Sequence, residues 1–370
     1  MSILPKRADL VALCLVAAWT LSGAASAAPL APEQIKKIDE LVATYMTAHQ
    51  VPGLSVAVVA EGELVWSQGY GLADSENNVP ARATTVYRTA SIGKTMTATA
   101  AMQLVEAGKL KLDVDMRQYC PAFPAKPYTI TTRQLLAHLS GIRHYGGPHD
   151  QEEQSSTKHY ANVIEAMAPF KDDPLLFEPG TKHLYSTYGY DVLGCVIEGA
   201  SGTPFLRYME EHVWKPAQMQ STRDDDPSAL IPLRARGYAL VNGKVRNALH
   251  VDMSNRMAAG GYVTTVVDLS RFAAAVMTGR LVRDETFQRM TKPTVLPNGQ
   301  KVGYGLGWGM ELEQWHDDTW TFHGGSSPGV SGILALMPRH KFAVAILANL
   351  EDLPDRSDFA ADIARAVLRF

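Results

Sequence analysis

The chain reads Thr89-Ala90-Ser91-Ile92-Gly93-Lys94-Thr95 at the beginning of a helix predicted over residues 91–107. Good helix formers dominate this span, and Gly108 ends it. Ser91 and Lys94 are three residues apart, so their side chains lie on one face of the first turn. A lysine that has lost its proton can accept the proton of the serine hydroxyl, and the N–H groups at a helix start favour a developing negative charge. The segment therefore predicts an acyl-transfer site of the Ser-x-x-Lys type.

This spacing alone is weak evidence, because common residues at one spacing recur by chance. A second copy, Ser155 and Lys158, lies in a polar run without apolar periodicity and is interpreted as a solvated loop. The triplet Gly93-Lys94-Thr95 does not indicate a phosphate-binding loop, because Arg88 stands where the first glycine of that motif would fall. The assignment of Ser91 therefore depends on other segments.

Two further segments place polar groups beside glycines. One reads Leu184-Tyr185-Ser186-Thr187-Tyr188-Gly189-Tyr190 and leads into a helix. The other, His323-Gly324-Gly325-Ser326, ends a strand with glycines that let a substrate backbone approach closely. Taken singly, the first favours an aromatic loop packed on the core, and the second is also compatible with a tight hairpin turn.

Other catalytic patterns are weaker. Residues 325–329 spell Gly-x-Ser-x-Gly around Ser327, but that motif needs a strand-to-helix elbow, and here a second strand-like run follows. The eleven histidines form no His-Glu-x-x-His motif or close ligand pair, so we predict no metal site and interpret His138, His144 and His149 as surface or structural residues.

Length and composition describe a core-forming globular protein. The 370 residues are enough for two packed units or one elaborated unit. Lys and Arg number 35 against 38 Asp and Glu, a net charge of −3, which argues against nucleic acid as a partner because its binders carry clustered basic charge. Long disorder, collagen and coiled coil do not fit this composition.

The N-terminus resembles a secretory signal. An apolar run over residues 10–21 follows Lys6 and Arg7, and Ala25-Ser26-Ala27 supplies the small side chains of a cleavage site. The run is too short to span a bilayer, and the alternative is a buried N-terminal helix. We expect residues 1–27 to be removed and the mature protein, without a stable membrane span, to be periplasmic or secreted.

Two cysteines, Cys120 and Cys195, remain after that cleavage. An oxidising compartment would permit them to pair, but two buried free thiols are the commoner arrangement for this pattern. The sequence favours free thiols and leaves pairing open.

Predicted secondary structure divides the chain into two units. A helix over residues 31–49 precedes strands over 54–60 and 64–70, residues 111–279 are mainly helical, and strands over 303–310, 318–323, 330–337 and 342–348 precede a last helix over 355–368. We predict an α/β sheet domain from residues 28–85 and 280–370, with a mainly helical domain, residues 86–279, between them. The segments of Ser91, Tyr185 and His323 would meet at their boundary.

Together these segments resemble the serine beta-lactamase and penicillin-binding-protein superfamily, in the branch of class C beta-lactamases, D-alanyl-D-alanine carboxypeptidases, family VIII esterases, D-aminopeptidases and the mitochondrial beta-lactamase-like serine protease. The matching segments occur in the family's order between residues 51 and 347: Val51-Pro52-Gly53-Leu54-Ser55-Val56-Ala57, Ala90-Ser91-Ile92-Gly93-Lys94, Leu135-Leu136-Ala137-His138-Leu139-Ser140-Gly141-Ile142, Phe177-Glu178-Pro179-Gly180, Tyr185-Ser186-Thr187-Tyr188-Gly189-Tyr190, Gly260-Gly261-Tyr262 and His323-Gly324-Gly325. The resemblance implies an antiparallel sheet flanked by the terminal helices, with an inserted helical domain.

The resemblance also implies roles for single residues. Ser91 would be the nucleophile and Lys94 its partner in proton transfer. Tyr185 would serve as base for acylation and acid toward the leaving group, sharing the proton with Lys94. The backbone N–H groups of Ser91 and Ser326 would form the oxyanion hole. The implied reaction is hydrolysis through an acyl-enzyme, without metal or cofactor.

Four residues are expected to bind substrate: Thr187, His323, Gly324 and Gly325. Two depart from the family pattern, because Thr187 replaces an asparagine and His323 replaces a lysine. A histidine is mostly neutral at pH 7, so a substrate carboxylate would be held less firmly and beta-lactams become poorer candidates.

We therefore expect a peptidase or amidase that acts on a small substrate. A carboxylesterase on short acyl esters, with weak or no beta-lactamase activity, is the alternative. A non-catalytic binding or sensor protein on the same scaffold is the alternative from another class. The oligomeric state does not follow from the sequence.

Overall fold

The computed structural model describes residues 28–146, 150–313, 315 and 317–368. The predicted signal segment, residues 1–27, lies outside the described residues. No helix of the described part combines the length and apolar character that crossing a membrane requires.

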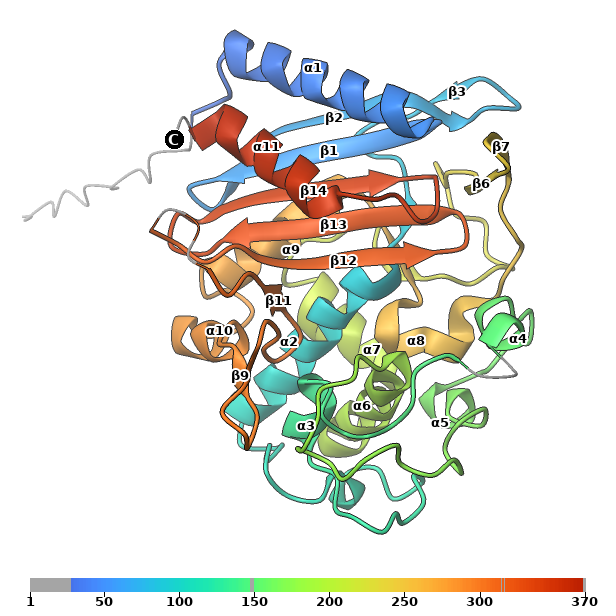
Figure 1. Ribbon diagram of the computed structural model, residues 1–370, viewed down its shortest axis with the longest axis vertical. Helices are drawn as coiled ribbons and strands as arrows, with labels where there is room; N and C mark the ends of the chain where they lie inside the picture. Colours follow the sequence, from blue (N-terminus) through green and yellow to red (C-terminus); the bar gives the residue numbers. More distant parts are fainter. Residues whose placement is uncertain (1–27, 147–149, 314, 316, 369–370) are drawn as a thin grey trace, which may run out of the picture.

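A seven-stranded antiparallel sheet forms the upper half of the molecule in Figure 1, with the strand order β11-β12-β13-β14-β1-β2-β3. β1 pairs with β14, so the first and last parts of the chain lie side by side. This arrangement confirms the predicted fold class. The strands are β1 (Gly53–Ala60), β2 (Glu63–Asp74), β3 (Val79–Pro80), β11 (Gly309–Met310), β12 (Thr321–Ser327), β13 (Val330–Met337) and β14 (Phe342–Ala348).

The central strands are covered on both faces. Alternate side chains of a strand point to opposite sides, so Val56 and Val58 pack with helices α1 (Pro32–His49) and α11 (Arg356–Leu368), which cover one face. Ala57 and Val59 pack with the helices below the sheet. Burial on both sides explains why these strands read as continuous apolar runs rather than as polar-apolar alternation.

Three long helices carry most of the lower half: α2 (Gly93–Glu106), α6 (Thr187–Ser201) and α9 (Val266–Met277). The shorter helices are α3 (Thr132–Leu136), α4 (Asp150–Gln154), α5 (Val163–Ala166), α7 (Phe205–Met209), α8 (Met257–Gly260) and α10 (Asp284–Met290). α2 is buried along almost its whole length because α6, α7 and α8 pack against it, and its first residues lie below the sheet.

Several elements differ from the sequence-based expectation. The strand expected over residues 303–310 is only the two-residue β11, and β12 extends to Ser327. The region expected to be mainly helical also contains a three-stranded sheet, β4 (Tyr87–Arg88), β8 (Tyr262–Thr264) and β5 (Arg223–Asp224), and a hairpin, β6 (Tyr238–Val241) with β7 (Lys244–Asn247). α9 packs directly against β1, β2 and β14. Such short strands form through tertiary pairing and leave no periodic pattern in the sequence.

Cys120 and Cys195 form a disulfide bond between residues 75 apart in the chain, so the expectation of free thiols was wrong. Gly199, one turn further along α6, explains how the two segments approach. A side chain there would place its Cβ 1.7 Å from the backbone oxygen of Tyr119, so only glycine lets α6 pack this closely against the segment of Cys120. This contact is tertiary and is invisible in the cysteine spacing.

We predict that reduction of this disulfide lowers the free energy of unfolding by about 2 to 4 kcal/mol, because the bond restricts a long loop in the unfolded chain. Urea denaturation with and without a reducing agent measures the difference. The Cys120→Ala/Cys195→Ala double variant is the control and should be insensitive to the reducing agent. Equal stabilities of the oxidised and reduced wild-type protein would contradict the prediction.

Candidate active site

Ser91 lies in a strained turn directly before α2. The turn is the short 3₁₀ helix η1 (Ala90–Ile92), and Ala90 has φ 44°, a left-handed conformation that is unfavourable for a residue with a side chain. Two glycines pack against the turn. A Cβ on Gly260 would lie 1.8 Å from the backbone oxygen of Ala90, and one on Gly325 would lie 2.6 Å from that of Thr89. Close backbone contact on both sides therefore holds Ser91 in place.

Lys94 is completely buried, and its amine contacts the nucleophile. Its Nζ lies 3.2 Å from Oγ of Ser91, 3.2 Å from Oγ1 of Thr187 and 2.9 Å from the backbone oxygen of Ala259. Burial lowers the pKa of the Lys94 ammonium to about 7, although the charge of Asp191 opposes the shift. A large fraction of Lys94 is therefore neutral at physiological pH and able to accept a proton.

Tyr185 lies on the other side of the Lys94 amine. The Nζ atom is 5.1 Å from the centre of the Tyr185 ring. Burial raises the pKa of the Tyr185 phenol well above its usual range, and a hydrogen bond with Ser91 opposes that shift. The phenol therefore keeps its proton at neutral pH, so Tyr185 has the protonation state of an acid and Lys94 that of a base.

The start of α6 fixes the loop that carries Tyr185 and Thr187. Ser186 is the N-cap of the helix, and its Oγ accepts a hydrogen bond from the N–H of Gly189 at 3.0 Å. The N–H groups of Ser186 and Thr187 donate to Nδ1 of His138 and of His144, at 3.1 and 3.2 Å. The two histidines interpreted as structural thus position the catalytic loop, a role that the sequence did not indicate.

His323 is buried, and both of its ring nitrogens have hydrogen-bond partners. Its Nδ1 lies 2.7 Å from the backbone oxygen of Gly324 and its Nε2 lies 3.0 Å from the hydroxyl of Tyr304. A neutral ring satisfies both contacts, with Nδ1 as donor and Nε2 as acceptor. Burial lowers the pKa of His323 to about 3, and the nearby charge of Lys94 adds to the effect. His323 is therefore uncharged throughout the physiological pH range.

A cavity of about 340 Å³ opens onto the nucleophile. Of the predicted site residues, Ser91, Lys94, Thr187 and Ser326 line it, whereas Tyr185, His323, Gly324 and Gly325 lie outside its lining. The remaining lining residues are Ala90, His144, Tyr145, Gly146, Gln154, Met253, Arg256, Ala259, Gly260 and Ser327.

Sequence reasoning missed three polar residues of this lining: Tyr145, Gln154 and Arg256. The only available signal was their position close to recognised segments. Arg256 stands four residues before Gly260, and Tyr145 follows shortly after the segment that ends at Ile142.

Ser327 ends β12 and is followed by a turn and β13, so it does not occupy a strand-to-helix elbow. This confirms that the Gly-x-Ser-x-Gly pattern is not a nucleophile elbow. Among the described residues, no group of three or more His, Cys, Asp or Glu side chains is arranged to hold a metal ion.

Comparison with known proteins agrees with this geometry. The family model described as Beta-lactamase matches residues 38–368. The chain is 32% identical to the mitochondrial serine beta-lactamase-like protein LACTB of Mus musculus, over 80% of this chain and 71% of that protein. The octameric penicillin-binding protein homologue from Pyrococcus abyssi has a similar structure, with a TM-score of 0.79, 24% identity, and coverage of 90% of this chain and 77% of that one. The D-amino acid amidase of Ochrobactrum anthropi SV3 superimposes with a TM-score of 0.76, 23% identity, and coverage of 91% and 99%.

We predict that Gly260→Ala displaces the turn of Ser91 and lowers the rate of ester hydrolysis by about a hundredfold or more, because small misplacements of a nucleophile are costly. Gly108→Ala is the matched control. Gly108 also has a positive φ, 69°, but has open space where a Cβ would stand, so that variant should lose about 1 kcal/mol of stability and keep its activity. Equal activities of the two folded variants would show that the contact with Ala90 is unimportant.

Proposed function

This chain belongs to the beta-lactamase family, and on that basis we propose that it is an exported serine hydrolase that cleaves a peptide or amide through an acyl-enzyme on Ser91. The observation that carries the proposal is the 3.2 Å contact between Nζ of Lys94 and Oγ of Ser91 in a buried environment.

Acylation begins with proton transfer from Ser91 to Lys94. The neutral amine takes the hydroxyl proton while Oγ attacks the substrate carbonyl carbon. The resulting oxyanion is stabilised by the backbone N–H groups of Ser91 and Ser326, which come from two different elements. The tight contact of Gly325 with the backbone at Thr89 and Ser91 supports this arrangement, because it brings the end of β12 next to the nucleophile turn.

Collapse of the intermediate requires a proton for the leaving group. Tyr185 donates its phenol proton to the departing nitrogen and recovers one from the Lys94 ammonium, so the proton of Ser91 ends on the leaving amine. An amine is a poor leaving group unless it is protonated, whereas an ester alcohol or phenol needs less assistance. The retained acid is therefore the feature that favours an amide or peptide over an ester. Water then hydrolyses the acyl-enzyme with the same groups acting in reverse.

The disulfide between Cys120 and Cys195 supports export, because such bonds persist in the periplasm and outside the cell but are rare in the cytosol. Microscopy or fractionation of a chain with an epitope tag at its C-terminus tests this part of the proposal. Retention in the cytoplasm with both cysteines reduced would refute it.

We predict that a fluorophosphonate probe labels Ser91 and that Ser91→Ala abolishes both labelling and turnover without unfolding the protein. Mass spectrometry of the digested adduct identifies the labelled residue. Ser155→Ala, in the second Ser-x-x-Lys copy, is the control and should label normally. A folded wild-type protein without an adduct on Ser91 would instead favour a non-catalytic binding or sensor protein.

A substrate panel separates the remaining alternatives. We propose comparing kcat/KM for D-amino-acid amides, Asp-containing peptides, short 4-nitrophenyl esters and a beta-lactam. Hydrolysis of an amide at a rate comparable to that of the esters supports the peptidase or amidase. Activity confined to esters shows a carboxylesterase. Weak ester hydrolysis alone does not discriminate, because an amidase and an esterase both hydrolyse esters.

We predict that the rate of Ser91 acylation rises with pH to a midpoint near 7 and then levels off, because the neutral form of Lys94 becomes dominant above its pKa of about 7. The second-order rate of fluorophosphonate labelling between about pH 5 and pH 9 measures the profile. Lys94→Met, which matches the shape of the buried side chain without its amine, should be slow and lack this midpoint. A wild-type rate that still increases steeply above pH 9 would contradict the assignment.

A further inference from the structure

Arg256 brings a permanent positive charge into the wall of the catalytic cavity. It stands directly before α8 and lines the same 340 Å³ space as Ser91 and Lys94. Only 5% of the residue is exposed. A buried guanidinium is costly unless it is compensated, so its hydrogen bonds and counter-charges are informative.

The hydrogen bonds of Arg256 leave part of the guanidinium unused. Nε donates to Oδ1 of Asn255 at 2.9 Å, and Nη2 donates to the backbone oxygens of Glu153 and Gln154 at 3.1 and 2.8 Å. Nη1, with its two N–H groups, has no acceptor among the side chains and backbone that the structure describes. Every acceptor present is neutral, so no hydrogen bond pairs the guanidinium with a carboxylate.

Neighbouring carboxylates do not supply the missing counter-charge. Glu153 forms its ion pair with Arg143, at 2.6 Å. Asp191 is close enough for Arg256 to lower its pKa against the opposing effect of burial, but the two side chains form no ion pair. Within the described side chains, Arg256 therefore forms no ion pair.

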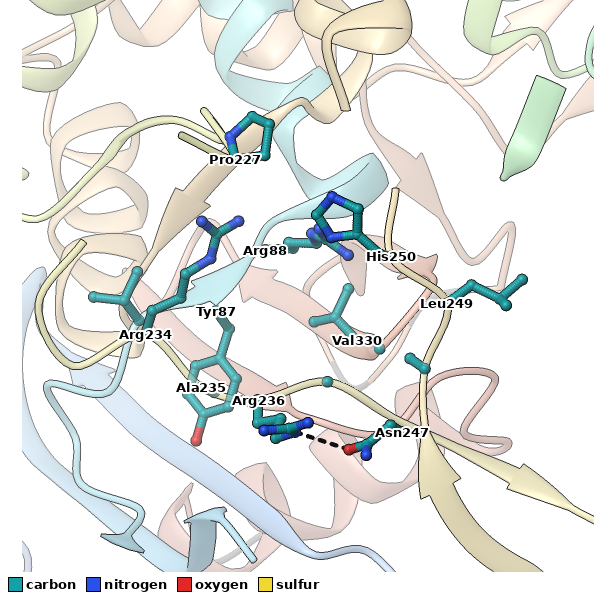
Figure 2. A pocket seen from close by; sticks show the side chains of 14 residues that line it. Tyr87, Arg88, Pro227, Arg234, Ala235, Arg236, Asn247, Leu249, His250 and Val330 are labelled. Carbon is teal, nitrogen blue, oxygen red and sulfur yellow. Dashed lines mark hydrogen bonds between the residues drawn. The ribbon is translucent and has the colours of Figure 1, made fainter. Parts of the chain in front are cut away.

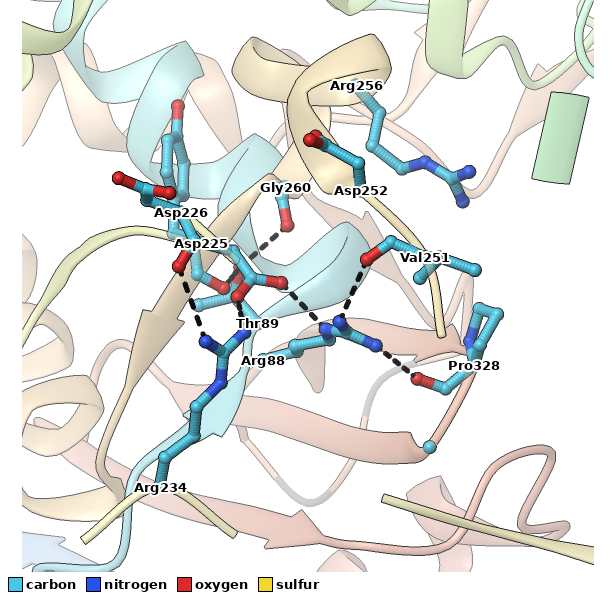
Figure 3. A network of polar contacts seen from close by, with 12 residues as sticks. Arg88, Thr89, Asp225, Asp226, Arg234, Val251, Asp252, Arg256, Gly260 and Pro328 are labelled. Carbon is cyan, nitrogen blue, oxygen red and sulfur yellow. Dashed lines mark hydrogen bonds and ion pairs between the residues drawn. The ribbon is translucent and has the colours of Figure 1, made fainter. Parts of the chain in front are cut away.

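Two other arginines nearby behave differently. Arg88 and Arg234 both bind the buried carboxylate of Asp225 (Figure 3). They line a separate cavity of about 330 Å³ on the far side of the turn at Pro328, shown in Figure 2. In Figure 3 Arg256 lies apart from this network, and its guanidinium points away from Asp225. The arginines Arg88 and Arg234 in the cavity of Figure 2 thus bind a carboxylate, whereas Arg256 in the catalytic cavity binds none among the described side chains.

Arg256 is also connected to the reacting groups. Its guanidinium stacks over the ring of Tyr145, 4.9 Å from the ring centre. Tyr145 hydrogen-bonds with Thr187, which contacts Nζ of Lys94. Two side chains, Tyr145 and Thr187, therefore separate the guanidinium from the amine beside the nucleophile.

The acyl portion of the substrate is the part that reaches this wall. Tyr185, the proton donor to the leaving group, does not line the cavity. In the proposed mechanism the leaving group is directed toward Tyr185, which leaves the acyl group on Ser91 on the side of Arg256.

We propose that Arg256 binds a carboxylate on the acyl portion of the substrate, so that the enzyme prefers acidic acyl groups. This inference rests on the proposed hydrolase function and names its substrate class. The two N–H groups of Nη1 have no acceptor among the described groups and can donate to a substrate carboxylate in this largely buried site, where charge-assisted hydrogen bonds are strongest. The sequence predicted a mostly neutral His323 and no permanent cation at the site, and it did not indicate Arg256 in the cavity wall.

The test compares esters that differ only in charge. Mono-4-nitrophenyl esters of glutaric, adipic and pimelic acid are each compared with the corresponding methyl-capped diester, after subtraction of the uncatalysed rate. We expect kcat/KM to be about tenfold to a hundredfold higher for the free acid at one chain length or more, as for a charge-assisted hydrogen bond. Equal or faster hydrolysis of the capped ester at every length would overturn the inference.

Variants identify the residue responsible. Arg256→Gln should reduce the ratio between acid and capped ester to about 1, and Arg256→Lys, which keeps the charge without the planar fork, should retain a smaller preference. Arg365→Gln, on the exposed face of α11, is the control for a change in net charge and should leave the ratio unchanged. An undiminished ratio in a folded Arg256→Gln variant would refute the role of this residue. If Arg256→Gln does not fold, an undiminished ratio in Arg256→Lys would refute that role instead.

The outcomes separate the inference from the proposed function. If the wild-type protein hydrolyses neutral esters and labels at Ser91 without a preference for the acids, only the inference about Arg256 fails. If no ester or amide is hydrolysed and Ser91 takes no fluorophosphonate, the hydrolase function fails and the inference fails with it.

Discussion

The arrangement of the site depends on one buried contact, the hydrogen bond between Nζ of Lys94 and Oγ of Ser91. An amine in water is protonated at pH 7 and cannot accept the serine proton. Burial of Lys94 under the sheet and beside α6 removes the water that stabilises the charged form, so the desolvation that packs the core also makes the base. The packing that removes water from Lys94 therefore both forms the core and gives the amine its basic, uncharged form.

The same low-polarity environment sets the protonation states of the other titratable groups. It keeps the proton on Tyr185, removes the charge from His323 and leaves Arg256 charged, because guanidinium loses its proton only at extreme pH. The charges around Ser91 thus depend on which side chains keep their charge when they are buried. His323 on β12 is uncharged, and Arg256, directly before α8, is the arginine of the cavity lining.

Much of the fold and part of the candidate site were predictable from residue patterns. The strand runs around Val56 and Val344, the helix after Ser91 and the ordered motif segments identified the fold, because periodicity and helix signals are local. Thr187 and Ser326 were placed at the site by resemblance, and both line the cavity. The short strands within residues 86–279, the packing of α9 on the sheet and the disulfide were not predictable, since each forms between segments that are distant in the chain.

The sequence by itself determined the antiparallel sheet built from both chain ends, the nucleophile segment and the likeness to acyl-transfer enzymes, because these depend on local spacing and on the order of motifs. Only the tertiary structure decided the protonation states and the charge of the pocket. A pKa depends on how deeply a group is buried and which charges surround it, and neither is encoded in neighbouring residues. The structure accordingly distinguishes Arg256, which has no ion-pair partner among the described side chains, from Arg88 and Arg234, which share Asp225.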